Sequence, residues 1–102
     1  MDAHDFVRAA VAGCAETPPD LVRALANDHH AGVRREVASH APADVRARLA
    51  RDPDPDVRHA VVFARALEPA LLDQLAQDAD RAVRTTAIAR RAREAAQRRW
   101  GH

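Results

Sequence analysis

A repeated spacing of Asp and Arg constrains the fold of this chain more than any other feature. Four times an Asp is followed six residues later by an Arg, and a Val stands directly before that Arg. The pairs recur at intervals of 26, 24 and 26 residues: Asp2/Arg8, Asp28/Arg34, Asp52/Arg58 and Asp78/Arg84. In three units a leucine stands three residues before the Asp, at Leu25, Leu49 and Leu75. Such a period is typical of helical arrays, in which each unit buries its apolar side against its neighbours.

The sequence pattern of each unit predicts two helices. The first starts at a proline, carries an i, i+4 apolar pair and lasts about nine residues. So short a helix leaves two geometries open, α throughout or partly 3₁₀. The second carries the Val-Arg-Val stripe and follows a turn in which Asp54 or Asp80 can cap the free N–H groups. His4 and His30 hold the same position in the two earlier units, where they are weaker caps.

The last second helix, from about Arg81 to Arg99, has no successor and is twice as long. We expect a terminal cap whose Ala and Ile stripe covers the preceding unit, with Ile88 as its anchor. The fold is then expected to be all-α, a single domain over residues 1–102 with about three and a half two-helix repeats. The units would span about residues 1–18, 19–42, 43–68 and 69–90.

The stretch from Leu21 to Val61 resembles the leucine-rich repeat variant family, whose units of about 24 residues follow a Leu, Leu-Ala, Asp-Pro, Val-Arg and Val-Ala pattern. The closest match to this pattern is the segment with Asp52, Pro53 and Val57. More distantly, the chain is similar to HEAT repeats, which usually run to about 40 residues. The resemblance implies a short right-handed α-solenoid.

Two departures from the family pattern matter. The 26-residue units carry two extra residues before the next first helix, clearest in Phe63 to Pro69, and we expect them to lengthen the preceding helix. Some family members also carry a cysteine cluster for an iron–sulfur centre, which the single Cys14 cannot supply.

The repeated polar residues predict a structural ladder rather than a catalytic site, because a catalytic site would occur once along the chain. Stacked helices lie about 10 Å apart, so each repeated position forms a column. We expect one column of carboxylates and, beside it, one of arginines that hydrogen-bond to carboxylates or turn carbonyls. The members are Asp28, Asp52, Asp78, Arg34, Arg58 and Arg84.

No metal, cofactor or enzymatic activity is expected. Zinc needs three or four ligands around one point, whereas His4 and His30 share a column in successive units and do not converge. No Gly-x-Ser-x-Gly turn occurs, and the three glycines form no phosphate-binding loop. Cys14 is expected to be a small buried residue rather than a reactive thiolate.

The cellular location expected from the sequence is the cytoplasm. A single cysteine suits a reducing compartment. No apolar run approaches the roughly 18 residues of a membrane span, and the first residues carry acids where a signal peptide would carry positive charge. No membrane partner is expected.

Charge is unevenly distributed although the net charge is only +1. Residues 81–99 hold seven arginines and one acid, and the preceding residues hold nine arginines and 14 acids. On the terminal helix Arg84, Arg91 and Arg98 recur every seven residues. This row could track the phosphates of a nucleic acid, or the arginines could simply solvate a capping helix.

The expected function is a non-enzymatic scaffold that binds a protein partner through the varying, outward positions of the second helices. Those positions are Arg35, Ser39, His59, Phe63 and Thr85, with Glu36 and Thr86 beside them. Phe63 is the candidate anchor, with a core role as the competing interpretation. The alternative function is nucleic-acid binding by the terminal helix. The chain would be a monomer or a weak homodimer, since an exposed stripe at the first unit could pair two chains.

Overall fold

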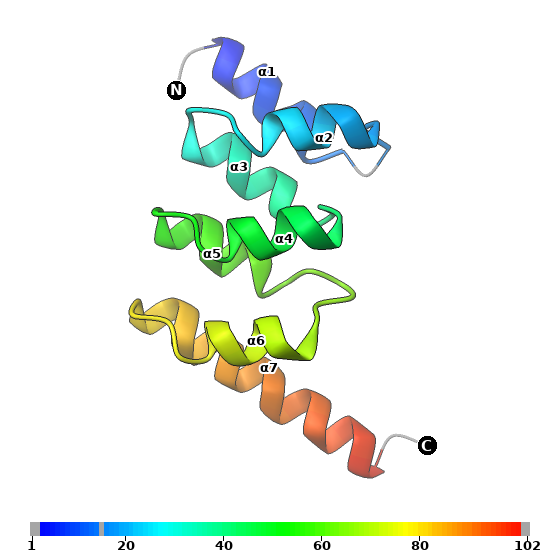
Figure 1. Cartoon of the computed structure of the whole chain (residues 1–102), viewed down its shortest axis with the longest axis vertical. Helices are drawn as coiled ribbons and strands as arrows, with labels where there is room; N and C mark the ends of the chain where they lie inside the picture. The colour runs from blue at the N-terminus through cyan, green and yellow to red at the C-terminus, as the bar shows by residue number, and fades with distance from the viewer. Residues whose placement is uncertain (1–2, 15, 101–102) are drawn as a thin grey trace.

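The computed structural model describes residues 3–14 and 16–100, with side chains from residue 7 onward. These residues form seven α-helices and no strand. The helices are α1 (Ala3–Ala12), α2 (Pro19–Leu25), α3 (Ala31–Ala38), α4 (Ala43–Leu49), α5 (Pro55–Val61), α6 (Pro69–Leu75) and α7 (Arg81–Trp100). They stack in two layers, with α2, α4 and α6 in one row and α1, α3, α5 and α7 in the other (Figure 1). The expected all-α repeat fold is confirmed, in a body of 45 × 29 × 20 Å.

The first helices of the repeats, α2, α4 and α6, are short but fully α-helical, with seven residues each. Of the two geometries that the sequence left open, the structure has the α form in these three helices. In α4, Arg46 N donates to Pro42 O and Ala50 N to Arg46 O, both at 2.9 Å, and both bonds have the α-helical i to i−4 spacing. A proline before or at the first position fixes the entry backbone angle, so even two turns close in α geometry.

The second helices start at side-chain caps. The side chain of Asp54 accepts a bond from Asp56 N at 2.8 Å, and that of Asp80 accepts one from Val83 N at 3.0 Å. His30 also caps, because its Nδ1 accepts from Gly32 N at 3.1 Å. The side chain of His4 lies outside the described residues.

The core lies between the two layers. Its centre is formed by apolar columns of the second helices that are fully buried: Val33, Val37, Val57, Val61, Val83 and Ala87. Leucines of the first helices cover these columns from the other layer: Leu25, Leu49 and Leu75. In α1, the same column holds Val7 and Val11, which are 60% and 37% exposed. No described helix precedes α1 to cover them.

The two extra residues of the third unit do not lengthen its second helix. That expectation is wrong, since α5 has seven residues and α3 has eight. The extra residues instead extend a non-helical loop, residues 62–68, between α5 and α6. Val62, Ala64 and Leu67 of this loop are buried, so the loop gains burial that a further helical turn projecting into solvent would not provide.

The buried apolar residues of helix α7 all lie in its first half. Val83 and Ala87 are fully buried, but Ile88 is 50% exposed, so the expectation that Ile88 anchors the helix is wrong. Ala92, Ala95 and Ala96, also expected to dock, are exposed. The reason is length, because α6 offers seven residues against the twenty of α7. We call residues 92–100, which follow the ion pair of Arg91 with Asp73 on α6, the overhang; this end of α7 runs on beyond α6 (Figure 1).

Candidate interaction surfaces

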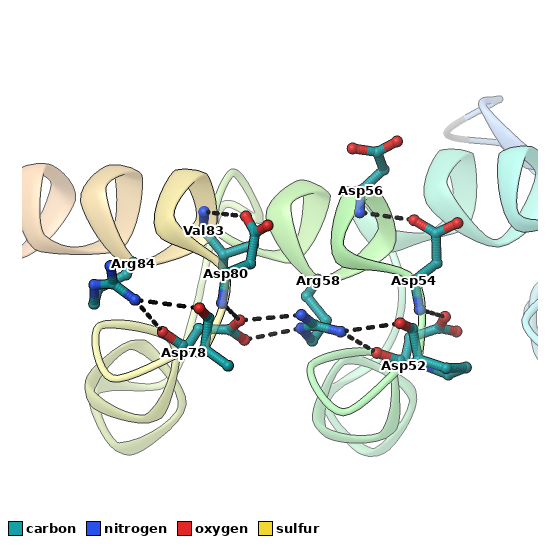
Figure 2. Close-up of polar contacts among 10 residues, drawn as sticks. Asp52, Asp54, Asp56, Arg58, Asp78, Asp80, Val83 and Arg84 are labelled. Carbon is teal, nitrogen blue, oxygen red and sulfur yellow. Dashed lines mark hydrogen bonds and ion pairs between the residues drawn. The ribbon is translucent and has the colours of Figure 1, made fainter.

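The repeated Asp and Arg side chains form one alternating chain along the stack. Nε and Nη2 of Arg34 donate to the two carboxylate oxygens of Asp52 at 2.8 and 3.1 Å. Arg58 binds Asp78 in the same way at 2.9 and 3.1 Å. At the N-terminal end Arg8 binds Asp28, at 2.6 Å through Nε. Each arginine therefore takes the carboxylate of the following repeat, as Figure 2 shows for Arg58 and Asp78.

The third guanidinium nitrogen of Arg34 and of Arg58 binds a backbone carbonyl of the arginine's own repeat. Nη1 of Arg34 donates to Asp28 O at 2.8 Å, and Nη1 of Arg58 donates to Asp52 O at 2.7 Å. Each ladder carboxylate also accepts the backbone N–H two residues further on; the Asp78 bond from Asp80 N is 2.8 Å long (Figure 2). In each repeat the Asp thus binds the arginine of the preceding repeat, and the Arg binds the carboxylate of the following repeat. Together they connect the turn before a second helix to both neighbouring repeats.

Charge pairing changes the ionisation of the ladder. Burial raises the pKa of Asp28, but the hydrogen bonds from Arg8 and the His30 N–H outweigh it, so the pKa of Asp28 lies below its usual value. The hydrogen bond to Asp52 raises the pKa of Arg34. Both groups are therefore held in their charged forms.

Two further arginines, which the sequence did not single out, hold the loop of residues 62–68. Arg90 on α7 donates to the carbonyls of Val62, Ala64 and Arg65. Arg46 on α4 donates to the carbonyl of Ala66 and to the carboxylate of Glu68, which lowers the pKa of Glu68. A non-helical loop leaves carbonyls that need donors, but sixteen arginines gave no signal of which ones would serve.

We use the term second-helix face for the outward positions expected to bind a partner: Arg35, Glu36, Ser39, His59, Phe63, Thr85 and Thr86. The structure brings three of its side chains together. Nε2 of His59 lies 2.9 Å from Oγ1 of Thr86, and the rings of His59 and Phe63 meet edge to face with centroids 5.2 Å apart. Phe63 is 57% exposed, so the core interpretation of Phe63 is wrong.

The remaining members of this face lie apart from that cluster. Arg35 and Ser39 lie on and directly after α3, and both are exposed. Arg35 lies 3.9 Å from Glu36, and Ser39 contacts the ring of His40 at 3.3 Å. Thr85 is exposed, and its neighbour Thr86 is the threonine that touches His59.

The three arginines of the seven-residue row on α7 have different surroundings. Arg84 donates to the carbonyls of Asp78 and Ala79 in the ladder. Arg91 lies 3.1 Å from Asp73 on α6. Arg98 is exposed beside Arg99 and Trp100, and no ion pair of Arg98 is found within the described residues. The row therefore does not present three equivalent free cations.

Within residues 3–14 and 16–100, no cluster of three or more His, Cys, Asp or Glu side chains is arranged to hold a metal ion. Cys14 is exposed, so the expectation that it is buried is wrong. It follows α1 at the end of the stack, where no described helix covers it. None of the helices described is long and apolar enough to cross a membrane.

Stacked helix pairs linked through a repeated Asp/Arg ladder define a short helical-repeat protein. Residues 31–54, from α3 to the cap of α5, match the model of the leucine rich repeat variant family. This segment is similar to a leucine rich repeat variant unit, which supports the resemblance inferred from the sequence. No curated protein and no solved structure matches the chain significantly.

Proposed function

We propose that the chain is a non-enzymatic scaffold of the cytoplasm that binds a protein partner through the second-helix face. The exposure of Phe63 is the observation that carries this proposal. The corresponding positions of the other units hold the small residues Gly13, Ser39 and Ala89. A large apolar side chain at the one site where its neighbours are small forms a protruding contact point.

The surroundings of Phe63 support binding at low entropic cost. Its ring lies against the ring of His59, and His59 is in turn held by Thr86 of the next repeat. An aromatic side chain that is already positioned loses little freedom on binding. Arg35 and Ser39, on the adjacent repeat, supply exposed polar groups for the rim of an interface.

The test compares Phe63→Ala with Leu21→Ala in capture experiments from native extract. Leu21 is a matched control, because it is an exposed apolar residue (41%) on the other layer. We expect Phe63→Ala to lose the proteins captured by the wild-type chain, with an unchanged melting temperature, and Leu21→Ala to retain them. Retention of the same proteins by Phe63→Ala would overturn the assignment.

A second candidate function is nucleic-acid binding, favoured by Arg98, Arg99 and the 80%-exposed Trp100 on the overhang. Arginine can contact phosphates, and an exposed aromatic ring can stack on a base. Against it, Arg84 and Arg91 already have protein partners. Retention of the wild-type chain on DNA or RNA at low salt, weakened by Arg91→Gln with Arg98→Gln, would favour this candidate. Lack of retention would exclude it.

A further inference from the structure

The guanidinium of Arg84, on α7, has one side open. Its Nη1 donates to the carbonyls of Asp78 and Ala79, at 2.9 and 3.3 Å. Within the part of the chain that the structure describes, its Nε and Nη2 have no partner, whereas the same two atoms of Arg58 bind the carboxylate of Asp78. Figure 2 shows this side of Arg84 directed away from Asp78. The two carbonyl bonds position Arg84, so it presents a fork that fits one carboxylate.

The filled forks of the earlier repeats define the ligand that fits the open one. In each of them the ligand is an Asp whose carboxylate also accepts the backbone N–H two residues later. Each of these turns leads into a second helix. A protein segment with an Asp in the turn before a helix therefore has the chemistry and the local shape that the Arg84 fork requires.

An uncovered apolar residue lies one helical turn from this fork. Ile88 follows Arg84 by four residues. The residues at the same place in the two preceding repeats are Ala38 and Val62. Those two are 0% and 1% exposed, whereas Ile88 is 50% exposed. The polar ladder and an apolar column thus both end on a surface whose counterpart is buried in the preceding repeats.

A groove between α6 and α7 continues this surface. Its volume is about 420 Å³, and its apolar lining consists of Pro69, Leu72, Ile88, Ala92 and Ala95. Arg84, Ile88 and Ala95 lie on one face of α7, because they are separated by four and seven residues. At 1.5 Å per residue, this face is about 16 Å long, which matches about three turns of a helix.

The charge around the groove favours an acidic occupant. The two carboxylates that line it, of Asp73 and Glu94, are already paired with arginines of α7. Among the described residues, Arg84 and Arg98 have no ion pair. Residues 81–99 carry seven arginines and one acid, so this end of the molecule is strongly positive. A partner surface of negative charge is complementary to it.

We propose that this face of α7 binds an acidic helical segment of a partner protein. An Asp in the turn before that helix binds Nε and Nη2 of Arg84, and apolar residues of the helix cover Ile88 and enter the groove. A phosphate would also fit the fork, but the apolar lining beside it favours a protein helix over a nucleic acid. The site goes beyond the proposed function and does not rest on it, since neither Arg84 nor Ile88 belongs to the second-helix face.

The probe is a synthetic peptide of residues 52–62, acetylated at its N-terminus and amidated at its C-terminus. It holds three acids and one arginine, and in the stack its Asp52 is the ligand of the Arg34 fork. Added to the isotope-labelled full chain, the peptide is expected to shift the Nε–H resonance of Arg84 in a saturable way, with a Kd of about 1 mM or lower. No shift at about 5 mM peptide would overturn the proposal.

A double-mutant cycle tests the contact between Arg84 and the Asp of the peptide, with the Kd measured from the backbone N–H resonance of Ile88. Arg84→Gln in the chain and Asp52→Asn in the peptide should each raise the Kd about tenfold or more. Together they should raise it no further than either does alone. Arg99→Gln removes the same charge from an exposed site on α7 and should bind as the wild-type chain does. Equal weakening by Arg99→Gln and Arg84→Gln, or losses that add in the cycle, would overturn the proposal.

Ile88→Asp keeps the test valid if Arg84→Gln is destabilised. Ile88 is half exposed, so the variant should fold, and its carboxylate should repel the peptide and raise the Kd about tenfold or more. Circular dichroism melting checks the fold of both variants. Unchanged peptide binding by Ile88→Asp would overturn the proposal. So would a short oligothymidylate that shifts the Arg84 resonance when the peptide does not, because the fork would then select phosphate.

Discussion

At the scale of single residues, the ladder requires the shape of arginine as well as its charge. Arg58 uses Nε and Nη2 for both oxygens of Asp78 while Nη1 reaches the backbone carbonyls of Asp52 and Pro53. A lysine ammonium is a compact point charge and cannot span these acceptors in one plane. The guanidinium side chain of Arg58 is only 17% exposed, so water does not easily replace the bonds.

Replacing Arg58 by Ala is therefore expected to lower the free energy of unfolding by about 1.5 to 3 kcal/mol, the range for hydrogen bonds to charged groups. The substitution leaves Asp78, which is 9% exposed at its side chain, without its main partner. Urea unfolding measures the loss, and Arg98→Ala on the overhang is the control that should change little. An unchanged midpoint for Arg58→Ala would contradict a stabilising ladder.

Acid should weaken the same network. The pKa of Asp28 is lower in the folded chain than its usual value, so the folded chain binds its proton less readily than the unfolded chain. The stability from this carboxylate is thus complete at neutral pH and is lost as pH falls below about 4. The difference in unfolding free energy between the wild-type chain and Asp28→Asn should shrink over that range. A free-energy difference that stays constant down to pH 2 would contradict a stabilising role of the ionised Asp28 carboxylate.

At the scale of the elements, the pairing and the order of the helices followed from the sequence, whereas the ends of elements did not. The repeated Val and Leu columns predicted each helix pair, because periodic burial is a local property of the chain. The fate of the residues after Val61 depended on Arg46 and Arg90, which come from two other helices. How much of α7 is buried depended on the length of α6, which periodicity does not reveal. The contacts of Phe63 likewise involve a neighbouring repeat.

Two substitutions in helix α7 test how far its burial extends. Ala87 is fully buried and Ile88 is 50% exposed, although both belong to the apolar stripe of the sequence. Ala87→Asp would bury an unpaired carboxylate and is expected to cost several kcal/mol. Ile88→Asp places the charge at the surface and should cost about 1 kcal/mol or less. Thermal melting of the two variants measures the order, and a larger loss at Ile88 would restore the role first expected for it.

At the scale of the whole molecule, the stack has an inside and two ends, so identical residues have unequal surroundings. Val57 occupies the middle of the stack and is fully buried, while Val7 in the same column is 60% exposed. Every interior repeat is covered on both sides by a neighbour, as in other linear arrays. Stability should therefore depend on the place of a residue in the stack more than on its place in the repeat.

One substitution made at both places tests this dependence. Val57→Ala removes two methyl groups from a filled site and is expected to cost roughly 2 kcal/mol. Val7→Ala removes the same atoms from a largely solvated site, so the expected cost is about 0.5 kcal/mol or less. Both losses are measured by urea unfolding. Equal losses at the two sites would contradict the exposed position of α1, because a solvated valine contributes little burial to lose.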